Sequence, residues 1–249
     1  MPPANHVWTL VIHHGLLAGI AFWLGVWVRV SGVKVNYTRK LNHFAVFFIP
    51  MALAPLLPYE KTPGGLALTA GVFLATTLLF LKPVRDRAAV CETAFASIDR
   101  PEDRPHTLFW ILSQYAAAFL VLSLNYFALR SLGRPELISL PLLVTAIGDG
   151  LAEPVGVRFG RHTYRVPALN GGGVYTRSWE GSAAVFASTL IIVLGYAAAG
   201  QFTRPQTAAL ALLLPPVMTL AEARSPHSWD APLLYAAGGA TTWAVVRWV

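Results

Sequence analysis

Charged residues and cysteines are both scarce in this sequence. Only 12% of its 249 residues are Asp, Glu, Lys or Arg, whereas soluble domains carry about a quarter. This scarcity argues against a soluble globular protein. The single cysteine, Cys91, excludes an intrachain disulfide and a cysteine-rich zinc site. No basic stripe with interleaved aromatic residues is present, so nucleic-acid binding is not expected in spite of a net charge of +7.

Hydrophobic residues make up 55% of the chain, and they lie in long blocks. Blocks of about 18 or more apolar residues with few charges predict membrane-spanning helices. We therefore expect an all-α, polytopic transmembrane helical bundle that forms a single domain over residues 1–249. The expected spans, seven or eight of them, lie near residues 8–30, 41–58, 64–81, 107–129, 136–154, 181–200, 205–221 and 231–248.

Lysine and arginine fall mostly into the loops on one side of such a bundle. With eight spans, 14 of the 19 basic residues lie on one side and 5 on the other. Basic residues collect in cytoplasmic loops, so we expect both termini outside and loops 82–106 and 155–180 in the cytoplasm. The pattern predicts a multi-pass integral protein of a bacterial inner membrane, with its active face cytoplasmic.

A carboxylate lies inside the fifth expected span, where it is costly to bury. An Asp at the centre of a membrane helix costs about 2.5–3.5 kcal/mol, so such a residue is a candidate functional group. At about 1.5 Å per residue, Asp149 lies roughly 20 Å along a helix that enters from outside. Glu153 follows one turn later on the same face. We expect Asp149 to act as a catalytic base or as a magnesium ligand; a structural ion pair is the alternative.

Small residues recur every four positions through the end of the same span. They are Gly148, Ala152, Gly156 and Gly160. This spacing is typical of helices that approach each other closely. We therefore expect one face of this helix to pack tightly against a neighbour, while the adjacent face presents the carboxylates.

The loop that follows this span is rich in arginine and glycine. Guanidinium groups and the amides of a glycine-rich turn suit phosphate oxygens, and free N–H groups at the next helix start attract anions. No G-x-x-x-x-G-K-[ST] run is present, so the loop is not a P-loop. An ordinary basic cytoplasmic loop is the alternative. The candidates are Arg158, Arg161, His162, Arg177 and Ser178, with residues 171–173 as the turn and Glu180 as a neighbouring carboxylate.

Two further polar clusters lie on the same expected face. One opens the second span and the other joins the last two spans. Carboxylates suit Mg²⁺, which proteins usually hold with one or two carboxylates plus substrate phosphates. Solvated helix ends are the alternative for each cluster taken alone. The first cluster contributes Arg39, Lys40 and His43, and the second contributes Glu222 and Asp230.

Four motifs of this chain occur together. They are Gly148-Asp149-Gly150-x-Ala152-x3-Gly156-x2-Phe159-Gly160, Arg177-Ser178-Trp179-x-Gly181-Ser182, Arg39-Lys40-x2-His43 and Glu222-Ala223-x-Ser225-Pro226-His227-x2-Asp230. Their combination resembles the signature of the phytol, farnesol and dolichol kinases, which are CTP-dependent prenol kinases distantly related to phosphatidate cytidylyltransferases. The resemblance covers about residues 38–233. Arg177 stands where that family usually has lysine.

The resemblance implies a kinase that transfers phosphate from CTP to a prenol-type lipid alcohol such as phytol, farnesol, geranylgeraniol or a polyprenol, with Mg²⁺ as cofactor. A phosphatidate cytidylyltransferase with the same nucleotide face is one alternative, and a transporter or membrane scaffold is another. The expected catalytic residues are Asp149, Glu180, Lys40 and His43; the expected nucleotide-binding residues are Arg39, Arg158, Arg161, His162, Arg177 and Ser178; the expected magnesium ligands are Asp149, Glu180, Glu222 and Asp230.

Overall fold

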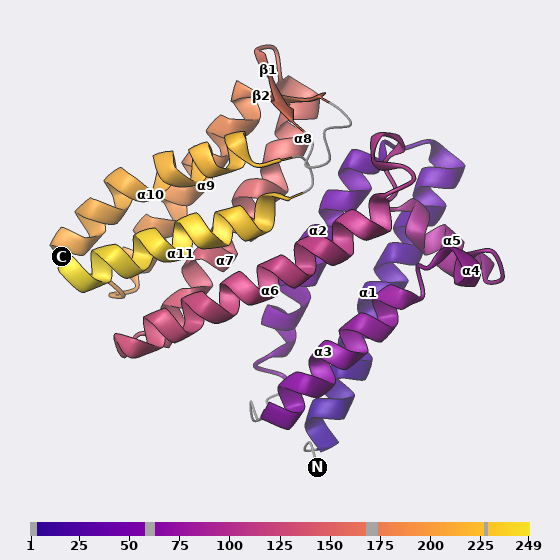
Figure 1. The fold of residues 1–249 in the computed structure, drawn as a ribbon, viewed down its shortest axis with the longest axis horizontal. Helices are drawn as coiled ribbons and strands as arrows, with labels where there is room; N and C mark the ends of the chain where they lie inside the picture. Colours follow the sequence, from indigo (N-terminus) through magenta and orange to yellow (C-terminus); the bar gives the residue numbers. More distant parts are fainter. Residues whose placement is uncertain (1–3, 58–62, 168–173, 227–228) are drawn as a thin grey trace. The chain divides into compact units, whose positions relative to one another are not determined.

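The computed structural model describes residues 4–57, 63–167, 174–226 and 229–249 (Figure 1). The described chain is mostly helical and divides into two compact units, Met1–Leu108 and Phe109–Val249. Each unit is described by itself below. That the two units pack as the single domain expected from the sequence stays a prediction.

The first unit is built around a long first helix that contacts three others. Helix α1 packs against α2, α3 and α5. A Cβ atom added to Gly25 of α1 would lie 1.7 Å from the Thr93 carbonyl oxygen of α5, so the two helices touch through their backbones. The elements of this unit are α1 (Ala4–Ser31), α2 (Val35–Leu53), α3 (Pro63–Leu78), α4 (Lys82–Arg85), α5 (Ala89–Ala96) and the 3-10 turn η1 (Pro101–Asp103).

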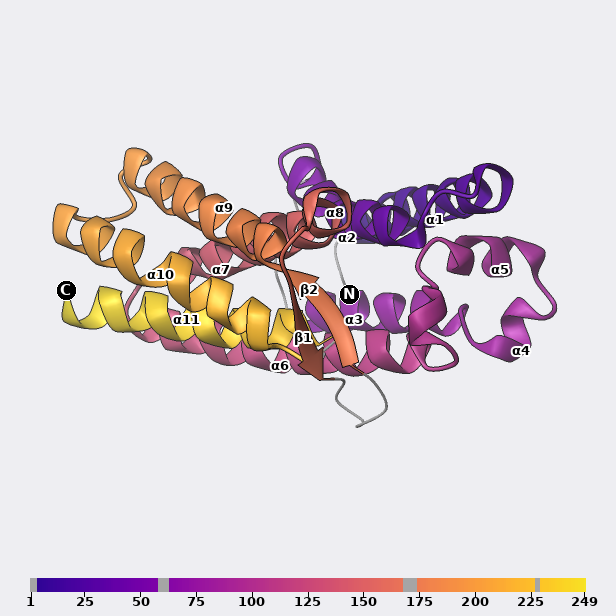
Figure 2. The same cartoon turned by 90° about the horizontal axis from the view of Figure 1, so that it is seen from above.

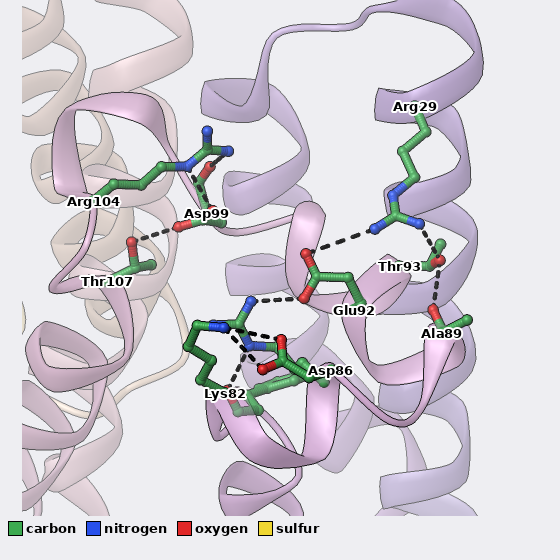
Figure 3. Close-up of polar contacts among 11 residues, drawn as sticks. Arg29, Lys82, Asp86, Ala89, Glu92, Thr93, Asp99, Arg104 and Thr107 are labelled. Carbon is green, nitrogen blue, oxygen red and sulfur yellow. Dashed lines mark hydrogen bonds and ion pairs between the residues drawn. The ribbon is translucent and has the colours of Figure 1, made fainter.

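The long loop expected after the third span is a folded segment in the structure (Figure 3). Asp99 accepts hydrogen bonds from Arg104 Nε at 2.7 Å and from the Thr107 hydroxyl at 2.6 Å. Arg29 of α1 lies 3.8 Å from the Glu92 carboxylate of α5. These contacts tie the segment to itself and to α1, and they account for three of its charged side chains.

The second unit consists of helices joined by one β-hairpin. Its elements are α6 (Thr107–Ser131), the 3-10 turn η2 (Pro135–Ile138), α7 (Ser139–Val144), the π-helical turn η3 (Thr145–Asp149), α8 (Gly150–Phe159), β1 (Thr163–Pro167), β2 (Val174–Ser178), α9 (Trp179–Ala198), α10 (Arg204–Arg224) and α11 (Asp230–Trp248). Helix α6 begins two residues before the boundary between the units. From η2 to α8 the chain forms one continuous helical segment.

Helices α9, α10 and α11 lie side by side in the second unit (Figures 1 and 2). Helix α9 also packs against α7, η3 and α8. Asn125 of α6 donates a hydrogen bond to the Tyr235 carbonyl of α11 at 2.6 Å. The apolar core between these helices contains Leu140, Val144, Val185, Val193, Leu210, Leu214, Met218 and Leu234. This core holds the ends of α8 and α10 and the starts of α9 and α11 at the same end as the hairpin (Figure 1).

The small residues of η3 and α8 pack against the N-cap and the first half of α9, as their spacing predicts. A Cβ atom on Gly156 would lie 2.9 Å from Ser178 Oγ, and one on Gly148 would lie 3.2 Å from Ser188 Oγ. From the other side, a Cβ on Gly181 would lie 2.6 Å from the Ala152 carbonyl oxygen. The predicted close approach of two helices is therefore confirmed.

Each of the eight expected spans contains a helix within the described ranges. Among the described residues, five helical segments are long and apolar enough to cross a membrane: Asn5–Ser31, Thr107–Ser131, Pro135–Phe159, Trp179–Ala198 and Arg204–Arg224. Helices α2, α3 and α11 do not meet both criteria. The chain is thus a helical protein with several candidate spans, and a total of seven or eight spans stays a prediction.

The expectation of an all-α fold is wrong between α8 and α9. Strands β1 and β2 pair in antiparallel fashion there, with Thr163 opposite Ser178 and Pro167 opposite Val174. Both strands are rich in β-branched and aromatic residues, which favour extended backbone over helix. Short polar stretches among long apolar blocks look like loops, so the hairpin was not expected.

We predict that Gly181→Ala destabilises the protein and that Gly195→Ala on the same helix does not. The added methyl group at position 181 would force α8 and α9 apart, and overpacking of this kind costs about 1–3 kcal/mol. At position 195 the new Cβ meets no described atom within 4 Å, and alanine is the better helix former. Melting temperatures in one detergent test this. A Gly181→Ala protein as stable as the wild type would contradict the close packing.

Candidate functional site

The β-hairpin sets the place of two polar side chains. In its register, Tyr164 of β1 lies directly opposite Arg177 of β2, so both side chains leave the same face of the hairpin. Strand β2 runs directly into α9, where Ser178 is the N-cap and its Oγ accepts a hydrogen bond from the Gly181 N–H at 3.0 Å. Arg177 is therefore fixed at the start of α9, one residue before its cap.

Arg177 lies between two carboxylates from two further helices. Its Nη1 is 2.9 Å from Oε1 of Glu222, in the last turn of α10, and its Nη2 donates to Oδ1 of Asp230, the first residue of α11. The three side chains are only 13%, 7% and 15% exposed, respectively. One guanidinium thus joins the hairpin, the end of α10 and the start of α11. We call these three residues the Arg177 cluster.

A chain of hydrogen bonds extends the Arg177 cluster to α9 and β1. The Ser182 hydroxyl donates to the second oxygen of Glu222 at 3.3 Å, and Ser182 Oγ lies 2.7 Å from the Tyr164 hydroxyl. Burial, and then the negative charge of Glu222, raise the pKa of Tyr164. The phenol is therefore protonated at neutral pH and donates to Ser182, which in turn donates to Glu222.

Electrostatics keep Arg177 charged in this setting. Burial opposes the charge, but the neighbouring carboxylates of Asp230 and then Glu222 outweigh burial and raise the pKa of the guanidinium. The guanidinium therefore stays charged across the physiological pH range.

Asp149 lies at the end of the π-helical turn η3 and is 7% exposed. π-helical turns inside α-helices occur frequently at functional sites. Turn η3 packs against α9 and α11, and the Asp149 carboxyl lies within electrostatic reach of Glu222 and of Tyr235 of α11. The carboxylate expected from the fifth span therefore belongs to the same polar end of the second unit as the Arg177 cluster.

Five other predicted residues flank this polar end. Glu180 accepts a hydrogen bond from His162 Nδ1 at 2.9 Å, and this contact joins the hairpin to the first turn of α9. Arg158 and Arg161 are exposed at the end of α8 and just beyond it. Ser178 is buried and caps α9. A role of these residues in nucleotide binding stays a prediction, and the glycine turn at 171–173 lies outside the described residues.

The remaining predicted residues, Arg39, Lys40 and His43, lie on α2 in the first unit. Lys40 is buried. The His43 ring contacts Phe47, with 4.9 Å between the ring centroids. Arg39 and Lys40 lie in the second turn of this helix and His43 lies near its middle. The structure therefore groups these three residues with each other.

The predicted magnesium ligands do not all lie in one cluster of carboxylates, because they contact different partners. Within the described residues, no group of three or more His, Cys, Asp or Glu side chains is arranged to hold a metal ion. Glu180 pairs with His162, whereas Glu222 and Asp230 flank Arg177. Because magnesium usually takes only one or two protein carboxylates together with substrate phosphates, Asp149, Glu222 and Asp230 are compatible with it, and a magnesium site stays a prediction.

The sequence did not single out Tyr164, and it gave Ser182 only as part of a motif. Tyr164 becomes a neighbour of Arg177 only through the register of the hairpin. Its one signal in the sequence is the alternation of Tyr164 and Val166 with polar residues, which is typical of a half-buried strand.

We predict that Arg177→Met strongly destabilises the protein. The change leaves Glu222 and Asp230 buried without their cation, and breaking a buried pair by removing one partner costs about 3–5 kcal/mol. Removing the two carboxylate charges as well, in Arg177→Met with Glu222→Gln and Asp230→Asn, should restore much of the lost stability. Melting temperatures of the single and triple variants test this. A single variant as stable as the wild type would refute the structural role of the cluster.

Comparison with known proteins finds a curated relative. The phytol kinase of Synechocystis sp. is 38% identical to this chain over 169 residues, which are 67% of this chain and 61% of the relative. The chain thus spans less than two thirds of the length of the curated relative that it matches. No family model matches the sequence, and no solved structure does.

The aligned length takes in about two thirds of this chain. The five apolar helices and this relative together indicate a membrane protein. The comparison confirms the resemblance to the prenol kinase family that the four motifs predict: this chain is a homologue of phytol kinase.

Proposed function

We propose that this protein is a membrane-bound kinase that transfers the γ-phosphoryl group of CTP to an isoprenoid alcohol. The observation that carries the proposal is the identity of 38% to a phytol kinase. Phytol is an isoprenoid alcohol, so we take an isoprenoid alcohol as the chemical class of the acceptor. The Arg177 cluster and Asp149 support the proposal because they place charged groups at one end of an apolar helical unit.

In the proposed reaction the alcohol oxygen attacks the γ-phosphorus. A new P–O bond forms, the bond from the γ-phosphorus to the bridging oxygen of the β-phosphate breaks, and CDP leaves. The hydroxyl proton passes to a carboxylate. Phosphoryl transfer depends mainly on positioning and on neutralising charge. Asp149, buried and within electrostatic reach of Glu222, is our candidate either for the base or for a magnesium ligand.

The basic residues divide into two kinds in this proposal. Arg158 and Arg161 are exposed beside the hairpin, so they can reach the triphosphate without giving up a buried partner. Arg177 is already paired with Glu222 and Asp230, so phosphate oxygens would have to share it with two carboxylates. We propose that Arg177 mainly orients the two carboxylates. Magnesium, when bound, would neutralise phosphate charge, and Glu222 and Asp230 would be its protein ligands.

We also propose that this polar end faces the cytoplasm of a bacterial inner membrane, with both chain termini outside. The support is the excess of basic residues, 14 to 5, on the side that carries the hairpin.

We predict that the purified protein transfers label to a prenol from CTP labelled at the γ-phosphate but not from CTP labelled at the α-phosphate. A kinase moves only the terminal phosphoryl group, whereas a cytidylyltransferase retains the α-phosphate in its lipid product. Thin-layer analysis of the lipid fraction distinguishes the two. Lipid labelled from the α-position would identify a cytidylyltransferase and refute the proposal.

Two carboxylate variants extend the same assay, one as the test and the other as its matched control. Asp149→Asn should lower turnover by at least about 100-fold, the contribution typical of a positioned acid–base group. Glu136→Gln removes a carboxylate at the other end of the same helical segment, where Glu136 is exposed and pairs with Arg134, and it should retain activity. An active Asp149→Asn protein would remove Asp149 from the proposed chemistry.

A further inference from the structure

An apolar groove lies on the second unit beside the Arg177 cluster. It is lined by Trp179, Ser182, Ala183 and Phe186 of α9 and by Thr219 of α10, and its volume is about 250 Å³. The four residues of α9 recur at helical spacing, so they share one face of the helix over about 10 Å. The groove therefore follows the helix away from the hairpin.

One lining residue belongs both to the groove and to the polar network. Ser182 is 3% exposed. Its Oγ lies 2.7 Å from the Tyr164 hydroxyl and donates to Glu222 at 3.3 Å. Glu222 in turn pairs with Arg177. The groove thus has a single polar end, which lies next to a buried carboxylate.

The rest of the groove is apolar and has large exposed walls. Trp179 is 64% exposed and Phe186 is 42% exposed. Thr219 donates its hydroxyl hydrogen to the Pro215 carbonyl within its own helix at 2.7 Å, so this hydrogen is not available to a ligand. Ala183 leaves space between the two aromatic side chains. Such a surface suits a ligand with an apolar chain and one small polar head.

We propose that this groove holds the isoprenoid chain of the lipid alcohol, with the hydroxyl at the Ser182 end. This inference rests on the proposed function and deepens it by placing the substrate. Enclosed ligand pockets measure about 300–1,000 Å³, so a groove of about 250 Å³ takes the isoprene units next to the hydroxyl. The rest of the chain continues along the lipid-facing surface of α9.

The chemistry of the polar end favours an alcohol over a bilayer phospholipid. A hydroxyl is neutral and can donate to the Ser182–Glu222 pair. A phospholipid would bring its anionic phosphate against Glu222 without the magnesium proposed to accompany the triphosphate, and like charges at short range repel. The occupant is therefore a lipid whose single polar group is a hydroxyl.

Filling the groove tests this placement. Ala183 is exposed, so Ala183→Phe adds bulk without entering the core. Ala198→Phe is the matched control, an exposed alanine at the far end of the same helix. Ala183→Phe should raise the KM for a C20 prenol by at least about tenfold, with the KM for CTP unchanged, while Ala198→Phe leaves both unchanged. Equal prenol KM values in the two variants would overturn the placement and leave the proposed kinase activity standing.

A binding experiment separates failure of the groove from failure of the proposed function. An isoprenoid alcohol that carries a diazirine on its second isoprene unit is photolysed with the purified protein in nanodiscs. Crosslinks should map to residues 179–186 or 219, diminish in Ala183→Phe, persist in Ala198→Phe, and be competed by phytol but not by excess phosphatidylglycerol. Such crosslinks in a protein without kinase activity would support the groove and refute the proposed function. Crosslinks elsewhere, or competition by the phospholipid, would overturn the inference.

Discussion

Two ion pairs from one arginine hold the charged end of the second unit together. Arg177 stands between the last turn of α10 and the first residue of α11, and its own strand leads directly into α9. Taking three charges out of water is costly, and their attraction offsets this cost only when each charge is satisfied. In the cluster each carboxylate faces Arg177, and Glu222 also accepts a hydrogen bond from Ser182. Its main effect is therefore to fix one arrangement of three helix ends.

The place of Asp149 depends on a second constraint, the close approach of α8 and α9. Glycine at positions 148, 156 and 181 allows backbone and small side chains to meet at distances that a larger residue would prevent. The π-helical turn ends at Asp149 on the same segment. Together these features bring a buried carboxylate within electrostatic reach of Glu222. The Arg177 cluster fixes the arrangement of the helix ends, and the packing of α8 against α9 fixes the position of Asp149.

Much of this arrangement could be predicted from the sequence, because hydrophobic blocks and small-residue spacing act locally. The helices, the tight face of α8 and the candidacy of Asp149, Arg177, Glu222 and Asp230 all came from such patterns. The pairing of Arg177 with two carboxylates could not be predicted, since it joins residues 45 and 53 positions apart whose approach depends on the packing of α9, α10 and α11. Tyr164 was missed because its position depends on the hairpin register.

The proposed kinase joins these features into one site, with an apolar groove, a buried acid and exposed arginines at the same end of the unit. We propose above all that this end of the unit carries out phosphoryl transfer on the cytoplasmic side of the membrane. CTP does not cross membranes, so sealed vesicles of opposite orientation test the claim directly. Prenol phosphorylation by external CTP should occur in inverted vesicles, and in right-side-out vesicles only after permeabilisation. Activity in intact right-side-out vesicles, or in neither preparation, would contradict it.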